Sequence, residues 1–224
     1  IFMDNSAGYS GGVLTGWNSH VMFERCSFIH NAAAKHGGAI FMDTCTCRRG
    51  YEAFIDCKFV NNYAGQDGGV IYVDSMIEMI TSFINCLITG NRAARHGGAL
   101  YDRTEGGTSW LVNCTLSGNV AMATESCNIQ CRSQVKVASC ILWDNEGSAI
   151  CSDDISFKYS DIERRPAGPS NIDADPCFVS PGYWDANGLW IDGDYRLLPS
   201  SPCIDTGDPE FCLLYTSPSP RDLS

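Results

Sequence analysis

Two histidines and an aspartate occupy one position of a repeated motif and could together perform acid–base or metal chemistry. His36, Asp67 and His96 each stand directly before a Gly-Gly pair. If the copies of the motif stack, these side chains come within reach of one another and could bind a metal ion or hold a proton. The same position holds Ser10 and Thr124, and a plainer interpretation is an outward turn position whose charges alternate because like charges on neighbouring strands repel.

A second candidate site follows each Gly-Gly pair, where aromatic and acidic residues alternate with aliphatic ones. If Ile40, Ile71 and Leu100 point inward, strand alternation turns the aromatic residues next to them outward. Exposed rings flanked by carboxylates are what a sugar-binding face requires, although ordinary outward strand residues would show the same pattern. The candidate ligand-binding residues here are Phe41, Asp43, Tyr72, Asp74, Tyr101 and Asp102.

Both candidate sites belong to a motif that the chain repeats with small variations. The clearest copies are CSFIHNAAAKHGGAI, CKFVNNYAGQDGGVI and CLITGNRAARHGGAL, and residues 2–14 fit the same frame without the cysteine. The recurring cysteines are Cys26, Cys57, Cys86, Cys114 and Cys140. The recurring asparagines are Asn5, Asn31, Asn62, Asn91, Asn119 and Asn145. Such internal periodicity indicates an array of stacked structural units.

Each copy predicts two or three short strands joined by tight turns, with no helical period long enough for a crossover. Residues 1–156 are therefore expected to form an all-β fold, a right-handed parallel β-helix of about six rungs. In this solenoid the asparagines would form a hydrogen-bonded ladder and the Gly-Gly pairs would form a corner. The recurring cysteines would form a column of buried thiols, although stacked neighbours also lie within disulfide range.

The chain contains 13 cysteines, and those outside the column are better disulfide candidates. An even number remains once Cys212 is set aside, which is compatible with an oxidising compartment. Cys177 and Cys203 could close the terminal segment, but the sequence does not fix the pairing. The cysteines outside the column are Cys45, Cys47, Cys127, Cys131, Cys151, Cys177 and Cys203.

The repeat ends near residue 156, and residues 157–211 are expected to form a last rung and a cap over the open strand edges. Four residues of this segment could gather a calcium ion, although their spacing differs from an EF-hand loop, and no other cofactor is expected. They are Asp185, Asn187, Asp192 and Asp194. Residues 212–224 include CLLYTSPSPRD, which resembles the translation of a transposase-type sequencing adapter, so they are expected not to be native.

The composition excludes some classes of partner. A net charge of −11 without a basic stripe argues against nucleic acid, and also against a polyanionic sugar polymer unless calcium bridges the two. No run of about 18 apolar residues is present, so the sequence predicts no transmembrane segment.

Two stretches resemble known families. The motifs Phe28-x-x-Asn31 and Phe59-x-x-Asn62, each followed by Gly-Gly and aliphatic residues, resemble the repeats of chlamydial polymorphic outer membrane proteins. Residues 171–208 resemble the end of exported β-helix proteins of the pectate-lyase-like superfamily that carry a choice-of-anchor segment. The resemblance implies a right-handed β-helix at the cell surface, associated with the outer membrane, or in the extracellular space.

The expected function is adhesion or carbohydrate binding, with a polysaccharide, a glycan, or the surface of a host or neighbouring cell as the partner. One alternative is a polysaccharide lyase or glycoside hydrolase, and another is a structural spacer without ligand. The catalytic motifs of the superfamily's enzymes are incomplete here, since Asp153-Asp154 stands alone and Arg164-Arg165-Pro166 does not match. Catalytic residues therefore remain unassigned, and fold analogy does not decide the function.

Overall fold

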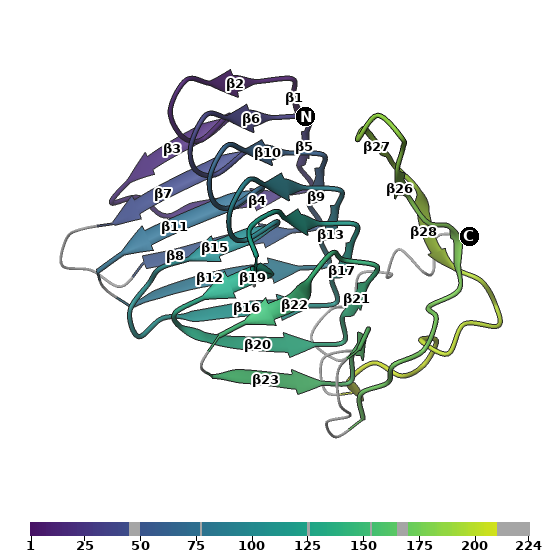
Figure 1. Ribbon diagram of the computed structural model, residues 1–224. Coiled ribbons are helices and arrows are strands. Elements are labelled where there is room, and N and C mark those ends of the chain that lie inside the picture. The colour runs from purple at the N-terminus through teal and green to yellow at the C-terminus, as the bar shows by residue number, and fades with distance from the viewer. Residues whose placement is uncertain (45–49, 77, 125, 153, 165–169, 210–224) are drawn as a thin grey trace.

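A computed structural model describes residues 1–44, 50–76, 78–124, 126–152, 154–164 and 170–209. All the secondary-structure elements of these residues are β-strands, and the chain winds them into a right-handed parallel β-helix (Figure 1). Each full turn contributes one strand to each of four sheets, which we name A to D in chain order. The predicted fold class is confirmed. No helix of the described residues is long and apolar enough to cross a bilayer.

The strands of the four sheets are short and pair in register. Sheet A contains β1 (Phe2–Met3), β5 (Ser27–Ile29), β9 (Lys58–Val60), β13 (Leu87–Thr89), β17 (Thr115–Ser117), β21 (Ile141–Trp143) and β24 (Asp161–Ile162). Sheet B contains β2 (Ser6–Ala7), β6 (Ala32–Ala33), β10 (Tyr63–Ala64), β14 (Arg92–Ala93) and β18 (Val120–Ala121). Sheet C contains β3 (Leu14–Trp17), β7 (Ile40–Thr44), β11 (Ile71–Ser75), β15 (Leu100–Asp102), β19 (Cys127–Cys131) and β22 (Ser148–Cys151). Sheet D contains β4 (Val21–Glu24), β8 (Gly50–Ile55), β12 (Met79–Ile84), β16 (Thr108–Val112), β20 (Gln134–Ala138) and β23 (Ile155–Lys158).

Three corners of each of the first four turns use a residue with positive φ. At the corner between sheets B and C this residue is the first glycine of the Gly-Gly pair, with φ of 63° at Gly37 and 71° at Gly68. The sequence analysis anticipated that corner. The other two corners place the residue before each column cysteine and the residue before each ladder asparagine in the same conformation, for example Asp56 and Asn61. Asp and Asn tolerate this region better than other side chains, so these positions are also encoded locally.

The recurring asparagines lie in one column at the corner between sheets A and B. From Asn5 to Asn119, each side-chain amide donates to the Oδ1 of the next asparagine, at 3.0 Å from Asn31 to Asn62 and 2.9 Å from Asn62 to Asn91. The same amide also donates to a backbone carbonyl of the preceding turn, and each Oδ1 also accepts a backbone N–H. Asn62 thereby uses its full hydrogen-bonding capacity while it is completely buried, which is the condition for placing an amide in a solenoid interior.

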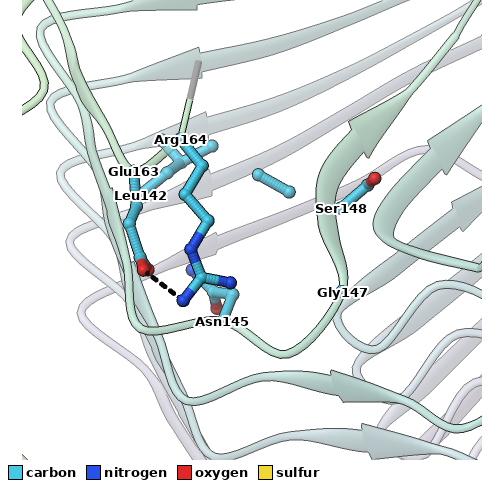
Figure 2. A pocket seen from close by; sticks show the side chains of 7 residues that line it. Leu142, Asn145, Gly147, Ser148, Glu163 and Arg164 are labelled. Carbon is cyan, nitrogen blue, oxygen red and sulfur yellow. Dashed lines mark ion pairs between the residues drawn. The ribbon is translucent and has the colours of Figure 1, made fainter.

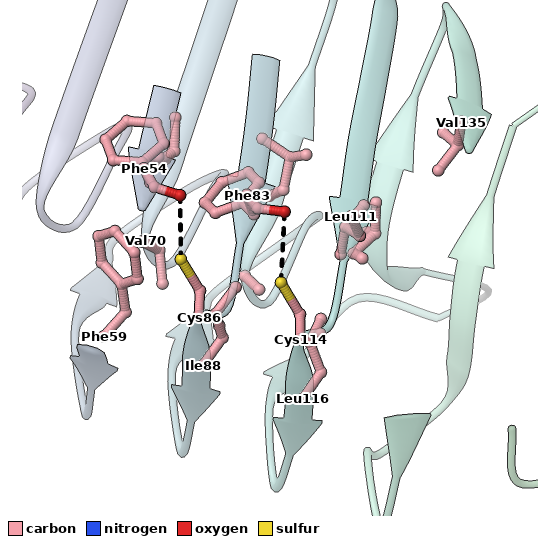
Figure 3. Packing of buried hydrophobic residues seen from close by; sticks show 14 of the residues in the cluster. Phe54, Phe59, Val70, Phe83, Cys86, Ile88, Leu111, Cys114, Leu116 and Val135 are labelled. Carbon is pink, nitrogen blue, oxygen red and sulfur yellow. Dashed lines mark hydrogen bonds between the residues drawn. The ribbon is translucent and has the colours of Figure 1, made fainter. Parts of the chain in front are cut away.

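The interior between the sheets is packed by stacked apolar side chains (Figure 3). The rings of Phe54 and Phe83 stack at 5.1 Å between centroids. The column cysteines lie beside them as thiols, and Cys86 Sγ donates to the carbonyl of Phe54 while Cys114 Sγ donates to that of Phe83. Burial raises the pKa of the Cys86 and Cys114 thiols, so they stay protonated and act as small apolar side chains.

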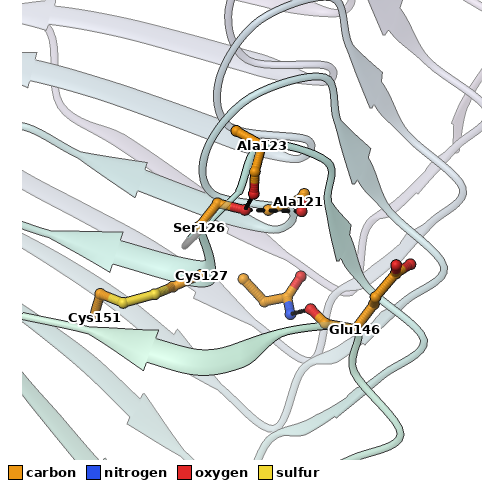
Figure 4. The surroundings of a disulfide bond; sticks show 7 residues. Ala121, Ala123, Ser126, Cys127, Glu146 and Cys151 are labelled. Carbon is orange, nitrogen blue, oxygen red and sulfur yellow. Dashed lines mark hydrogen bonds between the residues drawn. A yellow bond between two sulfur atoms is a disulfide. The ribbon is translucent and has the colours of Figure 1, made fainter.

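One disulfide joins Cys127 of β19 to Cys151 of β22 and links consecutive turns (Figure 4). Both cysteines are among those predicted to be better candidates than the column. The suggested pairing of Cys177 with Cys203 is wrong, because Cys177 donates to the carbonyl of Asp175 and Cys203 donates to the carboxylate of Asp161. Cys131 is a buried thiol. Cys45, Cys47 and residues 212–224 lie outside the described residues.

The C-terminal segment covers a side of the coil as well as its end. Ile172 pairs with Asp161 over the last turn. The chain then forms two antiparallel pairs, β25 (Phe178–Ser180) with β28 (Asp194–Leu197) and β26 (Tyr183–Trp184) with β27 (Trp190–Ile191). We call residues 178–197 the strap, since it lies beside sheet A (Figure 1). The sequence analysis expected a last rung and a cap from this segment, but it did not anticipate that residues 178–197 also run along a side of the coil.

Trp190 of the strap packs on two glycines at the corner between sheets A and B. A side chain at Gly90 or Gly118 would run into the ring of Trp190, whereas the preceding turns carry His30 and Asn61 at this position. The indole of Trp184 also donates to the carbonyl of Gly118 at 2.9 Å. Apolar burial of Trp190 against bare backbone therefore fixes the strap at these two turns.

We predict that Asn62→Ala destabilises the protein by about 3 kcal/mol or more, because Asn31 loses the acceptor for its side-chain and backbone N–H groups and buried unpaired groups are expensive. Chemical denaturation of the two proteins measures this. The control Asn187→Ala removes an exposed amide of the strap and should change stability by less than about 0.5 kcal/mol. Equal effects of the two substitutions would contradict the role of the ladder.

We predict that Gly118→Asn releases the strap and leaves the coil folded. Asparagine tolerates the positive φ of 64° at this position, but its side chain occupies the space of the Trp190 ring. Amide hydrogen exchange should accelerate across residues 178–197 and stay slow in sheets A to D. The control Asn61→Gly makes the reverse change at the same corner one turn earlier, where the structure already accommodates a side chain, and there the strap should stay protected.

Candidate functional site

The outer face of sheet C brings the sequence-predicted site residues together in three parallel columns. The register aligns Phe41, Tyr72 and Tyr101 in one column. A second column aligns Trp17, Asp43, Asp74 and Arg103, and the third lies at the Gly-Gly corner. Because stacked strands are about 4.8 Å apart, each column is a row of side chains along the axis of the coil. We call this surface the sheet C face.

The aromatic column points outward as predicted but offers little ring surface. Tyr72 stacks on Phe41 and on Tyr101, with 5.4 Å between ring centroids in both pairs. Phe41 is 9 % exposed and Tyr72 is 3 % exposed. The expectation of exposed flat rings is therefore wrong for these two residues. In-register stacking places the rings face to face, so the surface that would pack against a sugar ring is used by the neighbouring turn.

The charged column is more accessible and forms a small network with the aromatic one. Arg103 donates to the hydroxyl of Tyr72 at 3.2 Å and to Asp74 Oδ2 at 3.3 Å. The side chains of Arg103 and Asp74 are 38 % and 40 % exposed. Burial and the negative charge of Asp74 raise the pKa of Asp43, and burial raises the pKa of Tyr72. The network thus presents fixed donors and acceptors at a solvent-accessible surface.

The corner column contains the predicted histidines and aspartate, but they do not form a three-membered ladder. The carboxylate of Asp67 lies 3.3 Å from His36 Nδ1, also pairs with the Arg95 guanidinium, and accepts the backbone N–H of His96 at 3.2 Å. His96 directs its ring toward Tyr101 instead. Burial alone would raise the pKa of Asp67, but hydrogen bonds from His36 and Arg95 and the charge of Arg95 lower it below its usual value. The Asp67 carboxylate is thus paired with Arg95 and contacts His36, and it does not join the two histidine rings.

The corner column also ends earlier than predicted. At this corner the N–H of the first glycine donates to a backbone carbonyl of the following turn. Gly37 donates to Asp67 and Gly68 donates to His96, whereas Gly97 donates to Cys127. Thr124 therefore does not extend the column. Where the Gly-Gly pair is lost, the position is held by Cys127 of the disulfide.

Asp102 belongs to the interior and not to the sheet C face. It lies two residues after Leu100 on β15, so strand alternation turns it inward, where it is 1 % exposed. Its carboxylate accepts hydrogen bonds from the Thr104 N–H and the Ser109 hydroxyl, both at 2.8 Å. Its assignment as a ligand-binding residue of the outer face is therefore wrong.

A buried glutamate near Asp102 escaped the sequence analysis. Glu52 lies on β8 two residues before Phe54, and its side chain is completely buried. Burial and the negative charge of Asp102 raise the pKa of Glu52 to about 8. The sequence signal was present, because an acidic residue stands at an inward position of YEAFI, but the strand register had to be known to read it.

The residues proposed for calcium bind different partners. Asp185 accepts the backbone N–H groups of Asn187 and Leu189 in its own turn. Asp192 pairs with Lys58 at 2.7 Å, and Asp194 pairs with Arg196. Among the described residues no group of three or more His, Cys, Asp or Glu side chains is arranged to hold a metal ion.

A cavity of about 170 Å³ lies at the last turn, where sheet B has no strand to continue it (Figure 2). The ion pair between Glu163 and Arg164 at 3.0 Å spans its rim. Of the residues that the sequence analysis singled out, Asn145 alone lines this cavity. Its lining residues are Leu142, Asn145, Gly147, Ser148, Ala149, Glu163 and Arg164.

We predict that Asp67→Asn destabilises the protein by about 2 kcal/mol at neutral pH, since the ion pair with Arg95 is lost and the contact with His36 is weakened. The folded-state pKa of Asp67 is lowered, so its contribution is present above the ordinary carboxyl pKa and is lost as the pH falls through the folded value. The stability difference between the two proteins should thus shrink below about pH 4. The exposed Asp56→Asn serves as the control, and a difference that grows on acidification would refute the pairing.

Comparison with known families matches three turns of the coil. The Chlamydia polymorphic membrane protein (Chlamydia_PMP) repeat matches residues 25–43, 56–74 and 85–103. Each match runs from the corner before a column cysteine to the strand after Gly-Gly, and so includes most of the candidate residues. No curated protein and no solved structure matches the chain significantly. The chain is a right-handed parallel β-helix protein that carries repeats of the Chlamydia polymorphic membrane protein type in its second, third and fourth turns.

Proposed function

We propose that this β-helix is displayed at the outer membrane or cell surface and that its sheet C face binds a glycan. The matched repeats are those of a membrane protein family, which supports a surface-exposed, autotransporter-like role. The observation that carries the glycan proposal is the network of Tyr72, Asp74 and Arg103, with Asp43 beside it. Carboxylates and a guanidinium held at fixed spacing are suitable partners for the neighbouring hydroxyls of a sugar.

Sheets A and B offer less binding surface than sheet C. The strap covers part of sheet A through Trp190 and the pair between Lys58 and Asp192. Sheet B consists of two-residue strands and offers little area. The sheet C face continues over several turns and presents charges of both signs, since Asp43 and Asp74 are followed by Arg103 in the same column. A neutral or mixed-charge glycan fits this face better than a polyanion, given the net charge of −11.

A glycosidase is the second candidate, and one observation favours it. Burial and the charge of Asp74 raise the pKa of Asp43. A carboxyl group with a raised pKa next to a second carboxylate is the arrangement of a general acid and its partner. Release of reducing sugar from a bound glycan, abolished by Asp43→Asn alone, would establish this activity in addition to binding.

We predict that the purified protein binds glycans on an array and that Asp74→Asn combined with Arg103→Ala weakens this binding at least about tenfold, because hydrogen bonds to charged groups are lost. Lys136→Ala is the matched control, since Lys136 packs on Trp110 on the outer face of sheet D. The Lys136→Ala protein should bind the same glycans with the affinity of the unmodified protein. An array without bound glycan would refute the proposal, and binding to whole cells alone would then indicate a protein partner.

A further inference from the structure

The interior of the coil contains a polar region where sheet C turns into sheet D. On sheet D, Glu52, Thr81 and Ser109 follow one another in register, two residues before the core phenylalanines and leucine of their strands. Strand alternation therefore turns them inward. On sheet C, Asp102 faces them and bonds to Ser109. The oxygen-bearing side chains of this region, all at most 4 % exposed, are Glu52, Ser75, Thr81, Asp102, Thr104, Ser109 and Ser133.

Two carboxylates of this region have no countercharge among the residues that the structure describes. Within the part of the chain that the structure describes, neither Glu52 nor Asp102 forms an ion pair with a lysine, arginine or histidine. A buried carboxylate without a compensating charge is strongly destabilising, so such groups either take up a proton or bind a cation.

Several oxygen atoms of the region also lack hydrogen-bond partners. Both carboxylate oxygens of Glu52 and the hydroxyls of Thr81 and Thr104 are buried and have no hydrogen-bond partner within the described part of the chain. The Thr81 hydroxyl lies near enough to favour the charged form of Glu52, yet it does not reach the geometry of a hydrogen bond. Buried polar groups are almost always satisfied, and a proton shared between Glu52 and Thr81 would still leave the Thr104 hydroxyl unpaired.

The register arranges these groups in layers along the axis of the coil. Glu52 belongs to the second turn and Asp102 to the fourth, whereas the third turn supplies the hydroxyls of Ser75 and Thr81. Successive turns are about 4.8 Å apart. The two carboxylates therefore flank a layer of hydroxyl oxygens, and the longer side chain of Glu52 can reach toward it.

We propose that this interior region is a metal-binding site for a hard cation, with Ca²⁺ as its ligand, held between the carboxylates of Glu52 and Asp102 and by the intervening hydroxyls. Calcium takes six to eight oxygen ligands from carboxylates and neutral oxygens, and the region offers oxygen atoms of both kinds. The nearby thiol of Cys131 is kept protonated by burial and by the charge of Asp102, so it does not favour a soft metal. The site is separate from the sheet C face and does not depend on the proposed function.

The test is metal analysis of the full chain, unfolded in EDTA and refolded with millimolar CaCl₂, because the site is closed to solvent in the folded coil. After gel filtration in metal-free buffer, we expect about one calcium per chain and a Tm several degrees above that of protein refolded in EDTA. Refolding in parallel in NaCl, in KCl and in choline chloride shows whether a monovalent cation can occupy the site.

Glu52→Gln should lose the calcium and its effect on Tm. The control Glu105→Gln makes the same charge change at an exposed position next to Thr104, and it should retain both. If Glu52→Gln does not fold, Asp102→Asn tests the same loss.

Three outcomes would overturn the proposal. The first is refolded wild-type protein without bound metal and with a Tm independent of Ca²⁺, Na⁺ and K⁺. The second is calcium that remains bound in Glu52→Gln, which would place it elsewhere, for example on the strap. The third is a wild-type stability that falls between pH 4.5 and about 8 in EDTA and in CaCl₂ alike, while the stability of Glu52→Gln does not change over this range. Glu52 would then be neutralised by a proton and not by a cation.

Discussion

The constraint on which the whole molecule depends is in-register stacking of equivalent residues at one interstrand spacing. The asparagine ladder enforces it, because each Oδ1 accepts both the side-chain and the backbone N–H of the asparagine in the preceding turn. A shift of one residue would leave several completely buried donors and acceptors unpaired. The ladder therefore fixes the register of all four sheets, and with it the neighbours of each side chain.

Stacking also limits what an outward column can do. Aromatic residues such as Phe41 and Tyr72 cover one another's faces, so the column stabilises the coil more than it offers binding surface. Charged residues in the next column behave differently, because Asp74 and Arg103 are extended and keep their polar ends in solvent while they pair. The same rule explains the corner column, where Asp67 is held by His36 and Arg95 from adjacent turns.

The coil departs from its regular geometry at positions where the residue type differs from that of the repeated motif. Glycine replaces the ordinary corner residue at Gly90 and Gly118, and these two turns receive Trp190. The Gly-Gly corner is lost in the fifth turn, and the disulfide of Cys127 lies there. Glu52 and Asp102 stand at inward positions, and they create a polar region of the described core that contains two carboxylates. In a repeat protein, departures from the motif are therefore the positions to examine for specific function.

Most of the fold could be predicted from sequence because its determinants are local and recur. The asparagines, the column cysteines and the Gly-Gly pairs appear at matching positions in successive copies, and identical local chemistry repeated along a chain has few ways to pack. The inward direction of Ile40 and the outward direction of Phe41 followed from strand alternation alone. The sequence did not indicate how much of an outward ring remains exposed, because that depends on the ring stacked on it.

The candidate site was only partly predictable. The sequence by itself determined the coil, its corners and the columns that contain His36, Asp67 and Asp74, since each depends on residues close together in one copy of the motif. Only the tertiary structure decided that Arg95 takes the place of His96 at Asp67, that the strap lies along sheet A, and that Glu52 and Asp102 face one interior region. These outcomes depend on contacts between turns and on burial, which bring together residues that no local pattern connects.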